Sequence, residues 1–332
     1  MKNITIIGAG GWGTALAIHL SKQGYQVKLW VYEKDLAERM SRSRENDLYL
    51  PGFTIPESVT PSNSFQEAIE GAEVLLSVMP SHLCRSVYQQ MLPYLHKDLV
   101  FISATKGIEE GTMMRMSQVI RSVIGERFEP RIAVLSGPTF AREVASETPT
   151  AVVIASEEPS LARMIQQGFS CPYFRFYTSS DVIGLELAGA VKNIIAIASG
   201  IVTGLGYGHN TIAALITRGL AEMMRLTQAL GGRPETLAGL AGIGDLVLTC
   251  TGALSRNRRV GQRLGRGEKL ASITKGMQMV AEGVHTSRAV SQLGEKLGVE
   301  LPITAQVYAV LYQDKDPRQA LAELMQRELK EE

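Results

Sequence analysis

The order of apolar and polar positions divides the chain into two parts. Up to about residue 180, short apolar runs alternate with longer stretches in which apolar residues recur every three or four positions. The short runs are typical of buried strands, and the longer stretches are typical of amphipathic helices. Strands that alternate with helices predict an α/β domain built on a parallel sheet. The expected strands are residues 3–7, 26–31, 73–78, 99–103, 131–135, 150–155 and 173–177.

Beyond Asp181 the pattern is helical throughout. Residues 186–208 form an almost wholly apolar segment, and residues 211–230 carry apolar side chains at helical spacing before a Gly-Gly-Arg-Pro stop. A chain of 332 residues is long enough for two domains, each with its own core. We therefore expect a sheet domain over residues 1–181 and an all-α domain over residues 182–332.

A glycine-rich turn joins the first expected strand to the first expected helix. It reads Gly-Ala-Gly-Gly-Trp-Gly over residues 8–13. Gly8 allows the tight turn, Gly10 lets the backbone approach a pyrophosphate, and Gly13 lets the helix pack closely on the strand. The amides at the start of the helix then hold the phosphates. With a strand before it and a helix after it, the motif predicts a Rossmann-like, doubly wound sheet that binds NAD or NADP.

The end of the second expected strand is where such a fold recognises the adenine ribose. An acidic residue there favours a free 2′-hydroxyl and an arginine favours a 2′-phosphate, so Glu33 favours NAD. Lys34, Arg39, Arg42 and Arg44 follow closely and weaken that preference, although a solvated helix face is their ordinary role. Both dinucleotides therefore remain open.

Lys192 is the one cation in the long apolar segment. A buried ammonium is costly, so the group either pairs with an anion or gives up its proton, and a lysine so placed can serve as an acid or a base. The alternative is a lysine whose stem packs on the helix while its amine reaches water. Because Lys192 and Asn193 interrupt the apolar run, we expect no membrane span.

Composition excludes several classes of protein. The formal net charge is +1 with Lys and Arg spread along the chain, which argues against a nucleic-acid surface. The three cysteines are far apart and the five histidines lack metal-ligand spacing, so we expect no disulfide framework, no metal and a cytoplasmic location. Apolar helices in the second domain are consistent with a homodimer or with a core.

Polar side chains gather where the expected strands end and again in the helical part. Lys106 and residues 136–141 follow two strands, at the edge of the sheet that carries the glycine turn. A glycine-flanked Asp245 precedes the run Ser255, Arg256 and Asn257. Guanidinium binds phosphate in a bidentate manner, so that run suits an anion, although solvated arginines and a packing loop would look alike.

Seven motifs occur in order along the chain: Gly8-x-Gly10-x-x-Gly13 with Trp12, Ser103-Ala104-Thr105-Lys106-Gly107, Ser136-Gly137-Pro138-Thr139-Phe140-Ala141, Gly189-Ala190-x-Lys192-Asn193, Gly242-x-Gly244-Asp245-Leu246, Ser255-Arg256-Asn257-Arg258 and Val280-x-Glu282-Gly283. Together these motifs resemble one family over nearly the whole chain: the bacterial NAD(P)-dependent glycerol-3-phosphate dehydrogenases. One departure argues against a strict NADP preference, because the family often carries arginine after the second strand where this chain has Tyr32 and Glu33.

The resemblance implies a substrate, glycerol 3-phosphate or dihydroxyacetone phosphate, and a role in supplying glycerol 3-phosphate for phospholipid synthesis. It implies that Lys192 donates and accepts the proton at the reacting carbon, with Asp245 and Lys106 beside it. The implied substrate contacts are Lys106, Gly137, Thr139, Lys192, Asp245, Ser255, Arg256 and Asn257. The implied dinucleotide contacts are Gly11, Trp12, Lys106, Ala141, Arg256, Val280 and Glu282, in addition to Gly8, Gly10 and Gly13 of the motif.

Three other functions fit part of the pattern. A reductase of a 3-hydroxyacid or of ketopantoate would share the dinucleotide domain and a helical second domain, but Arg256 and Asn257 argue for a phosphate. A redox sensor without enzymatic activity would have no use for Lys192, Asp245 and Arg256 together. A structural or nucleic-acid role fits least, because the charge is balanced.

Overall fold

A computed structural model describes residues 1–277, 279–329 and 331 of the protein. The chain separates into two compact units. The sheet unit comprises Met1–Lys106 and Arg115–Leu185, and the helical unit comprises Gly107–Met114 and Glu186–Glu332. The segment Gly107–Met114 thus packs with the helices, although the chain on both sides of it belongs to the sheet unit.

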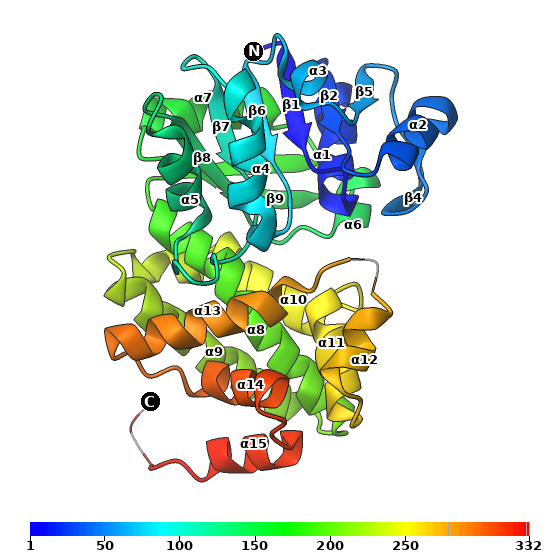
Figure 1. Ribbon diagram of the computed structural model, residues 1–332. Helices are drawn as coiled ribbons and strands as arrows, with labels where there is room; N and C mark the ends of the chain where they lie inside the picture. Colours follow the sequence, from blue (N-terminus) through cyan, green and yellow to red (C-terminus); the bar gives the residue numbers. More distant parts are fainter. Residues whose placement is uncertain (278, 330, 332) are drawn as a thin grey trace. The chain divides into compact units, whose positions relative to one another are not determined.

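The sheet unit is built on eight strands in the order β10-β9-β8-β7-β6-β1-β2-β5 (Figure 1). All neighbours are parallel except β8 and β9, which are antiparallel. Between β6 and β2, strand β1 marks the point where the strand order reverses, which is where such sheets bind ligands. The strands are β1 (Asn3–Ile7), β2 (Gln26–Trp30), β5 (Val59–Ser62), β6 (Val74–Ser77), β7 (Val100–Ser103), β8 (Arg131–Ser136), β9 (Thr150–Ala155) and β10 (Phe174–Ser179).

The expected strands and the doubly wound α/β class are confirmed, and β5 and the hairpin of β3 (Glu45–Asn46) and β4 (Leu50–Thr54) were not expected. The central strands β1, β6, β7 and β8 are buried on both faces over nearly their whole length, as parallel strands covered by helices must be, whereas β5 and β10 are partly exposed. Figure 1 shows α4 and α5 across the near face. The helices of this unit are α1 (Gly11–Lys22), α2 (Lys34–Ser43), α3 (Phe65–Ile69), α4 (Cys84–Met91), α5 (Met116–Ile124), α6 (Ala141–Ala145) and α7 (Pro159–Phe169), with 3-10 turns Ser81–Leu83 and Leu92–Tyr94.

The helical unit is organised around α8 (Val182–Gly204), whose first turn lies in the sheet unit. This helix is long and apolar enough to cross a membrane, but 94% of its most apolar stretch is buried inside the protein, as in a core helix. The other helices are α9 (His209–Ala229), α10 (Asp245–Thr251), α11 (Arg256–Gly265), α12 (Leu270–Lys275), α13 (Glu282–Leu297), α14 (Pro302–Tyr312) and α15 (Pro317–Met325), with short turns Pro234–Ala238 and Leu240–Gly244.

Glycines on α8 and α11 set the distance between these two helices. A Cβ added at Gly200 would lie 2.1 Å from the carbonyl oxygen of Arg258, and one at Gly261 would lie 2.0 Å from that of Ile197. Such distances are possible only without side chains, so the two backbones are in direct contact. The start of α11 is therefore held at a fixed place along α8.

Candidate functional site

The glycine turn has the geometry that its sequence predicts. Gly8 has a φ of +114°, and a Cβ there would lie 2.3 Å from the carbonyl oxygen of Val78. A Cβ at Gly13 would lie 1.9 Å from the carbonyl oxygen of Gly8, so α1 starts directly against the turn. A Cβ at Gly10 would meet no atom within 4 Å, which leaves the backbone open to a pyrophosphate at the start of α1.

A second segment, residues 46–49, supports this turn, although no motif or periodicity in the sequence assigns it to the site. The side-chain amide of Asn46 donates to the carbonyl oxygen of Ala9 and to Oγ1 of Thr14, both at 2.8 Å. Its oxygen accepts the backbone N–H of Tyr49 at 3.0 Å. A Cβ at Gly11 would lie 2.9 Å from the carbonyl oxygen of Tyr49, so the segment lies against the turn itself.

Lys106 and the turn after β8 meet at the carboxyl edge of the sheet. The ammonium of Lys106 donates to the carbonyl oxygen of Gly137 at 3.0 Å, and the hydroxyl of Thr139 donates to the same oxygen at 3.2 Å. Gly137 has a φ of +148°, and a Cβ there would lie 3.0 Å from Cα of Val152. A cation and a hydroxyl are thus fixed together by one carbonyl oxygen.

The start of α6 and the start of α1 are neighbours in the same unit. The Cβ of Ala141, the first residue of α6, would lie 3.6 Å from a Cβ added at Gly11. The indole N–H of Trp12 is buried and has no hydrogen-bond partner within the described part of the chain. An open backbone, a helix start and an unpartnered donor are features that suit a dinucleotide.

Lys192 lies in the middle of α8 and is paired. Its ammonium is 2.9 Å from Oδ1 of Asp245 and donates to Oγ1 of Thr249 at 2.7 Å. Lys192 is 5% exposed and Asp245 is 1% exposed, so the amine does not reach bulk water along the surface of the helix. Asp245 and Thr249 stand one turn apart on α10, which places both on the face that meets α8. The pairing satisfies an ammonium that burial would otherwise penalise.

Asn257 joins three helices. Its amide nitrogen donates to Oδ1 of Asn193 on α8 at 2.8 Å, and its oxygen accepts the backbone N–H of Gly283 on α13 at 2.9 Å. Gly283 must be a glycine, because a Cβ there would lie 2.5 Å from the carbonyl oxygen of Asn193. Ser255 caps α11 by accepting the backbone N–H of Arg258 at 3.2 Å. The start of α11 is therefore rigid.

Arg256 is the first residue of α11, and Glu282 is the first residue of α13. Much of the Arg256 side chain is exposed, and Val280 and Glu282 are half-buried. Partial loss of solvation lowers the pKa of Arg256 from its ordinary value, and the negative charge of Glu282 acts in the opposite direction. The guanidinium remains a cation, which is what a phosphate site needs.

The predicted site residues thus fall into two groups, one on each unit. Hydrogen bonds or an ion pair join Lys106 and Thr139 to Gly137, Lys192 to Asp245, and Asn257 to Gly283. Among residues 1–277, 279–329 and 331, no three His, Cys, Asp or Glu side chains are placed to hold a metal ion. The sheet unit carries Gly8, Gly10, Gly11, Trp12, Gly13, Lys106, Gly137, Thr139 and Ala141, and the helical unit carries Lys192, Asp245, Ser255, Arg256, Asn257, Val280 and Glu282.

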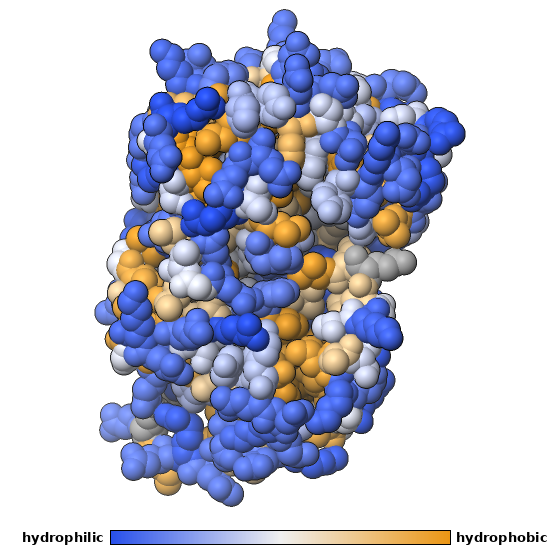
Figure 2. Space-filling model, in the orientation of Figure 1, coloured by the Kyte–Doolittle hydropathy of each residue, from blue (hydrophilic) through white to orange (hydrophobic). Residues whose placement is uncertain are grey.

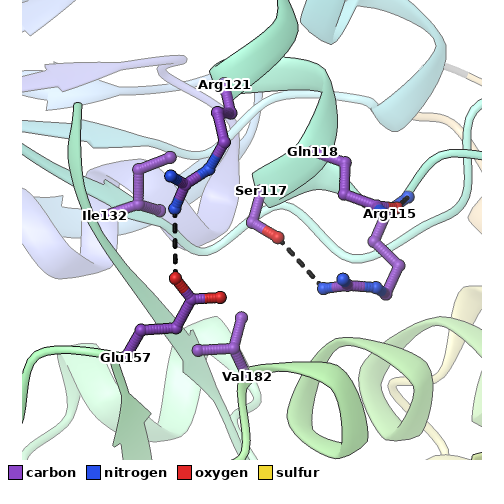
Figure 3. A pocket seen from close by; sticks show the side chains of 7 residues that line it. All are labelled: Arg115, Ser117, Gln118, Arg121, Ile132, Glu157 and Val182. Carbon is purple, nitrogen blue, oxygen red and sulfur yellow. Dashed lines mark hydrogen bonds and ion pairs between the residues drawn. The ribbon is translucent and has the colours of Figure 1, made fainter. Parts of the chain in front are cut away.

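A small cavity of about 50 Å³ lies elsewhere in the sheet unit (Figure 3). It contains none of the predicted site residues, and its charges are already engaged: Arg121 pairs with Glu157 at 3.2 Å. The volume is well below the roughly 300 Å³ at which ligand pockets begin. It is lined by Arg115, Ser117, Gln118, Arg121, Ile132, Glu157 and Val182.

Comparison with known proteins identifies the family. The family models described as NAD-dependent glycerol-3-phosphate dehydrogenase N-terminus and C-terminus match residues 3–162 and 181–322. The chain belongs to this family.

Close relatives share its whole length. It is 56% identical to the glycerol-3-phosphate dehydrogenase [NAD(P)+] of Syntrophotalea carbinolica, over 99% of both chains. It is also 56% identical to that of Koribacter versatilis, over 98% of both. The crystal structure of glycerol-3-phosphate dehydrogenase from Coxiella burnetii matches with a TM-score of 0.94 at 41% identity, covering 98% of this chain and 99% of that one. The family that the motifs resemble is therefore confirmed.

Proposed function

We propose that the protein catalyses reversible hydride transfer between NAD(P)H and C2 of dihydroxyacetone phosphate, forming sn-glycerol 3-phosphate. Membership of the family supports this reaction, and the observation that carries it is the buried pair of Lys192 and Asp245. An ion pair removed from water and held by a threonine serves as a prepared proton donor. By the family's usual task, the product would serve phospholipid synthesis in the cytoplasm.

In the reducing direction, Lys192 protonates the alkoxide that develops at C2, and in the oxidising direction its neutral amine accepts that proton. The dinucleotide, when bound, supplies or takes up the hydride. Asp245 and Thr249 fix the amine through contacts of 2.9 and 2.7 Å, so little reorganisation is needed when the proton moves. Lys106, which donates to Gly137 within the sheet unit, is a further proposed contact of the substrate.

The proposed phosphate site is the start of α11. Arg256 supplies the cation, with Ser255 and Asn257 beside it in sequence. Holding a remote phosphate converts binding energy into orientation at C2. Gly137 and Thr139 are the remaining proposed contacts of the substrate. For the dinucleotide, we propose Gly8, Gly10, Gly11, Trp12, Gly13, Lys106, Ala141, Arg256, Val280 and Glu282.

A panel of carbonyl acceptors tests the reaction. Initial rates of NADH and NADPH oxidation are measured with dihydroxyacetone phosphate, with dihydroxyacetone and with ketopantoate. We expect kcat/KM to be on the order of 1,000-fold higher for dihydroxyacetone phosphate, because an acceptor without the phosphate loses the charge-assisted binding at Arg256 that orients C2. Arg256→Gln should lower that ratio mainly through KM for the phosphorylated substrate. Equal rates with the unphosphorylated acceptor, or a preference for ketopantoate, would overturn the proposal.

A homodimer is part of the same proposal. The apolar helices of the helical unit are compatible with one, and sedimentation equilibrium at several protein concentrations would separate a dimer from a monomer.

A further inference from the structure

The backbone that carries Glu33 is held rigidly. Glu33 immediately precedes α2 and is half-buried. The side-chain amide of Asn63 donates to the carbonyl oxygens of Val31 and Tyr32, at 2.8 and 2.6 Å. Trp30, the last residue of β2, stacks on Phe65 with ring centres 4.3 Å apart. The position of the Glu33 backbone is therefore set by the sheet and by the loop after β5.

The Glu33 carboxylate is held as well. The hydroxyl of Tyr49 donates to Oε1 of Glu33 at 2.6 Å. The backbone N–H of Tyr49 is fixed by Asn46, which is bonded to the glycine turn. Burial and the adjacent carboxylate raise the pKa of Tyr49 to about 12, so its hydroxyl keeps its proton at neutral pH. A continuous chain of hydrogen bonds thus ties the acid at the end of β2 to the turn that receives the pyrophosphate.

One oxygen of this carboxylate remains to accept a ligand. Tyr49 contacts Oε1, and no hydrogen bond to Oε2 of Glu33 occurs within residues 1–277, 279–329 and 331. An ionised carboxylate accepts hydrogen bonds and donates none, so it suits a ribose hydroxyl and repels a phosphate.

The arginines of α2 are engaged by acidic neighbours. Arg39 donates to Asp35 at 2.6 Å and to both oxygens of Asp47 at 3.1 and 3.2 Å. Arg42 lies 3.9 Å from Glu38 and is well exposed. The surface over α2 is strongly hydrophilic (Figure 2). Because Arg39 is shared by two carboxylates, it offers little net positive charge to a 2′-phosphate.

Arg44 is directed at the backbone of the loop before β5. Its guanidinium donates to the carbonyl oxygens of Ile55 at 3.1 Å and Val59 at 3.0 Å, and also to that of Pro56. This arginine ends α2 in the left-handed conformation and fastens the hairpin to the sheet. Its donors are committed to three carbonyl groups, so binding a phosphate would leave those groups without partners.

Lys34 is the cation that competes with Glu33. It is the first residue of α2 and its side chain is exposed. An exposed ammonium is well hydrated and screened by salt, whereas Glu33 is half-buried and preorganised. The carboxylate of Glu33 therefore has a larger effect than the ammonium of Lys34 on the binding of a nearby ribose.

We propose that Glu33, held by Tyr49, selects NAD over NADP in this protein. The inference rests on the proposed use of a dinucleotide. The free oxygen of Glu33 accepts the 2′-hydroxyl of NAD, whereas the 2′-phosphate of NADP meets a carboxylate, and Arg39 of α2 is already shared by Asp35 and Asp47. A like-charge contact is unfavourable, so we expect NADH to be favoured over NADPH by on the order of 100-fold.

The test measures affinity and turnover separately. Dissociation constants for NADH and NADPH are measured by fluorescence titration, and kcat/KM for both is measured with dihydroxyacetone phosphate. The variants are Glu33→Gln, Tyr49→Phe and, as the matched control, Lys34→Gln. We expect Glu33→Gln to bring the NADH to NADPH ratio within about tenfold of unity, because it removes the repulsion. Tyr49→Phe should weaken NADH binding with less effect on NADPH, and Lys34→Gln should leave the ratio within about threefold of its original value.

Three results would overturn the inference: a wild-type preference for NADPH, an unchanged ratio in Glu33→Gln, or a larger change in Lys34→Gln than in Glu33→Gln. Selective binding of NADH by a protein that turns over no acceptor would support the inference and overturn the proposed reaction. Selective turnover with NADH would support both.

Discussion

Replacing Asp245 by Asn removes the charge opposite Lys192 and nearly preserves the shape of the side chain. The two charged groups are 2.9 Å apart and almost fully buried, at 5% and 1% exposure. After the replacement, the ammonium retains Thr249 at 2.7 Å and gains an amide oxygen in place of an anion. The change therefore isolates the electrostatic part of the pair.

Three estimates limit the loss of stability expected for Asp245→Asn. Two unit charges at this separation attract by about 6 kcal/mol at an effective dielectric constant of about 20. Breaking a buried pair typically costs about 3–5 kcal/mol. The upper bound is set by deprotonation, since an ordinary lysine with a pKa of about 10.4 can be neutralised at pH 7 for about 4.6 kcal/mol. A loss of about 4 kcal/mol corresponds to a fall in Tm on the order of 10 °C for a unit of this size.

Thermal unfolding followed by circular dichroism measures this loss. The set comprises Asp245→Asn, Lys192→Met, the double variant, and the control Asp314→Asn, which breaks the exposed pair with Lys269. We expect the control to change Tm by no more than a degree or two, because exposed pairs contribute about 0–1 kcal/mol. The double variant should be more stable than the sum of the two single losses predicts, since it leaves no buried charge alone.

The pH dependence of the stability of Asp245→Asn gives a second test of the pair. If Lys192 is neutral in the folded variant, the unfolded chain binds one more proton than the folded chain. The stability of Asp245→Asn should then rise relative to the wild type as the pH is raised from about 7 toward about 10. Additive losses in the double variant, or a loss in Asp245→Asn as small as that in Asp314→Asn, would refute the buried ion pair.

Three further predictions concern other sites. Burial raises the pKa of Glu222 to about 7, so the folded protein binds this proton more tightly than the unfolded chain does. The stability that this group contributes therefore falls as the pH rises from about 4.5 through about 7. Glu222→Gln should flatten the plot of Tm against pH over this range, and an unchanged slope would contradict the prediction. Asn257→Ala leaves the side-chain oxygen of Asn193 and the backbone N–H of Gly283 without their hydrogen-bond partner. The free energy of unfolding measured with urea should therefore fall by about 1–3 kcal/mol, and a loss below about 0.5 kcal/mol would contradict the prediction. Gly13→Ala should weaken NADH binding at least tenfold in a fluorescence titration, because its Cβ would lie 1.9 Å from a carbonyl oxygen; unchanged affinity would show that the turn does not need this contact.

Features with a local pattern could be predicted from the sequence. The glycine turn and the buried strands are encoded in neighbouring residues, and the structure places them where the pattern does. Lys192 stands out in the sequence because it is the one cation in an apolar helix, and the structure pairs it with Asp245. The strand 150–155 was expected, but its antiparallel pairing with β8 depends on the path of the chain around α6 and not on its own residues.

Hydrogen bonds between side chains and groups that are distant in the sequence could not be predicted. Asn46 bonds to Ala9 and Thr14, and Tyr49 bonds to Glu33, across gaps in the sequence that have no periodic signal. Arg44 belonged to an expected solvated face, yet it binds carbonyl groups of the backbone, because its left-handed conformation turns it away from α2. The loop between α2 and β5 has a Pro- and Gly-rich composition typical of a connection, and its role depends on these tertiary contacts.

The most direct test of the proposed chemistry compares hydride transfer with dinucleotide binding in Lys192→Ala. NADH oxidation in the presence of saturating dihydroxyacetone phosphate is followed beside the fluorescence titration of NADH, which also verifies that the variant is folded. We expect turnover to fall by on the order of 1,000-fold, as for loss of a general acid, while the Kd for NADH changes by less than about threefold. A variant that remains fully active would show that the proton at C2 comes from another group.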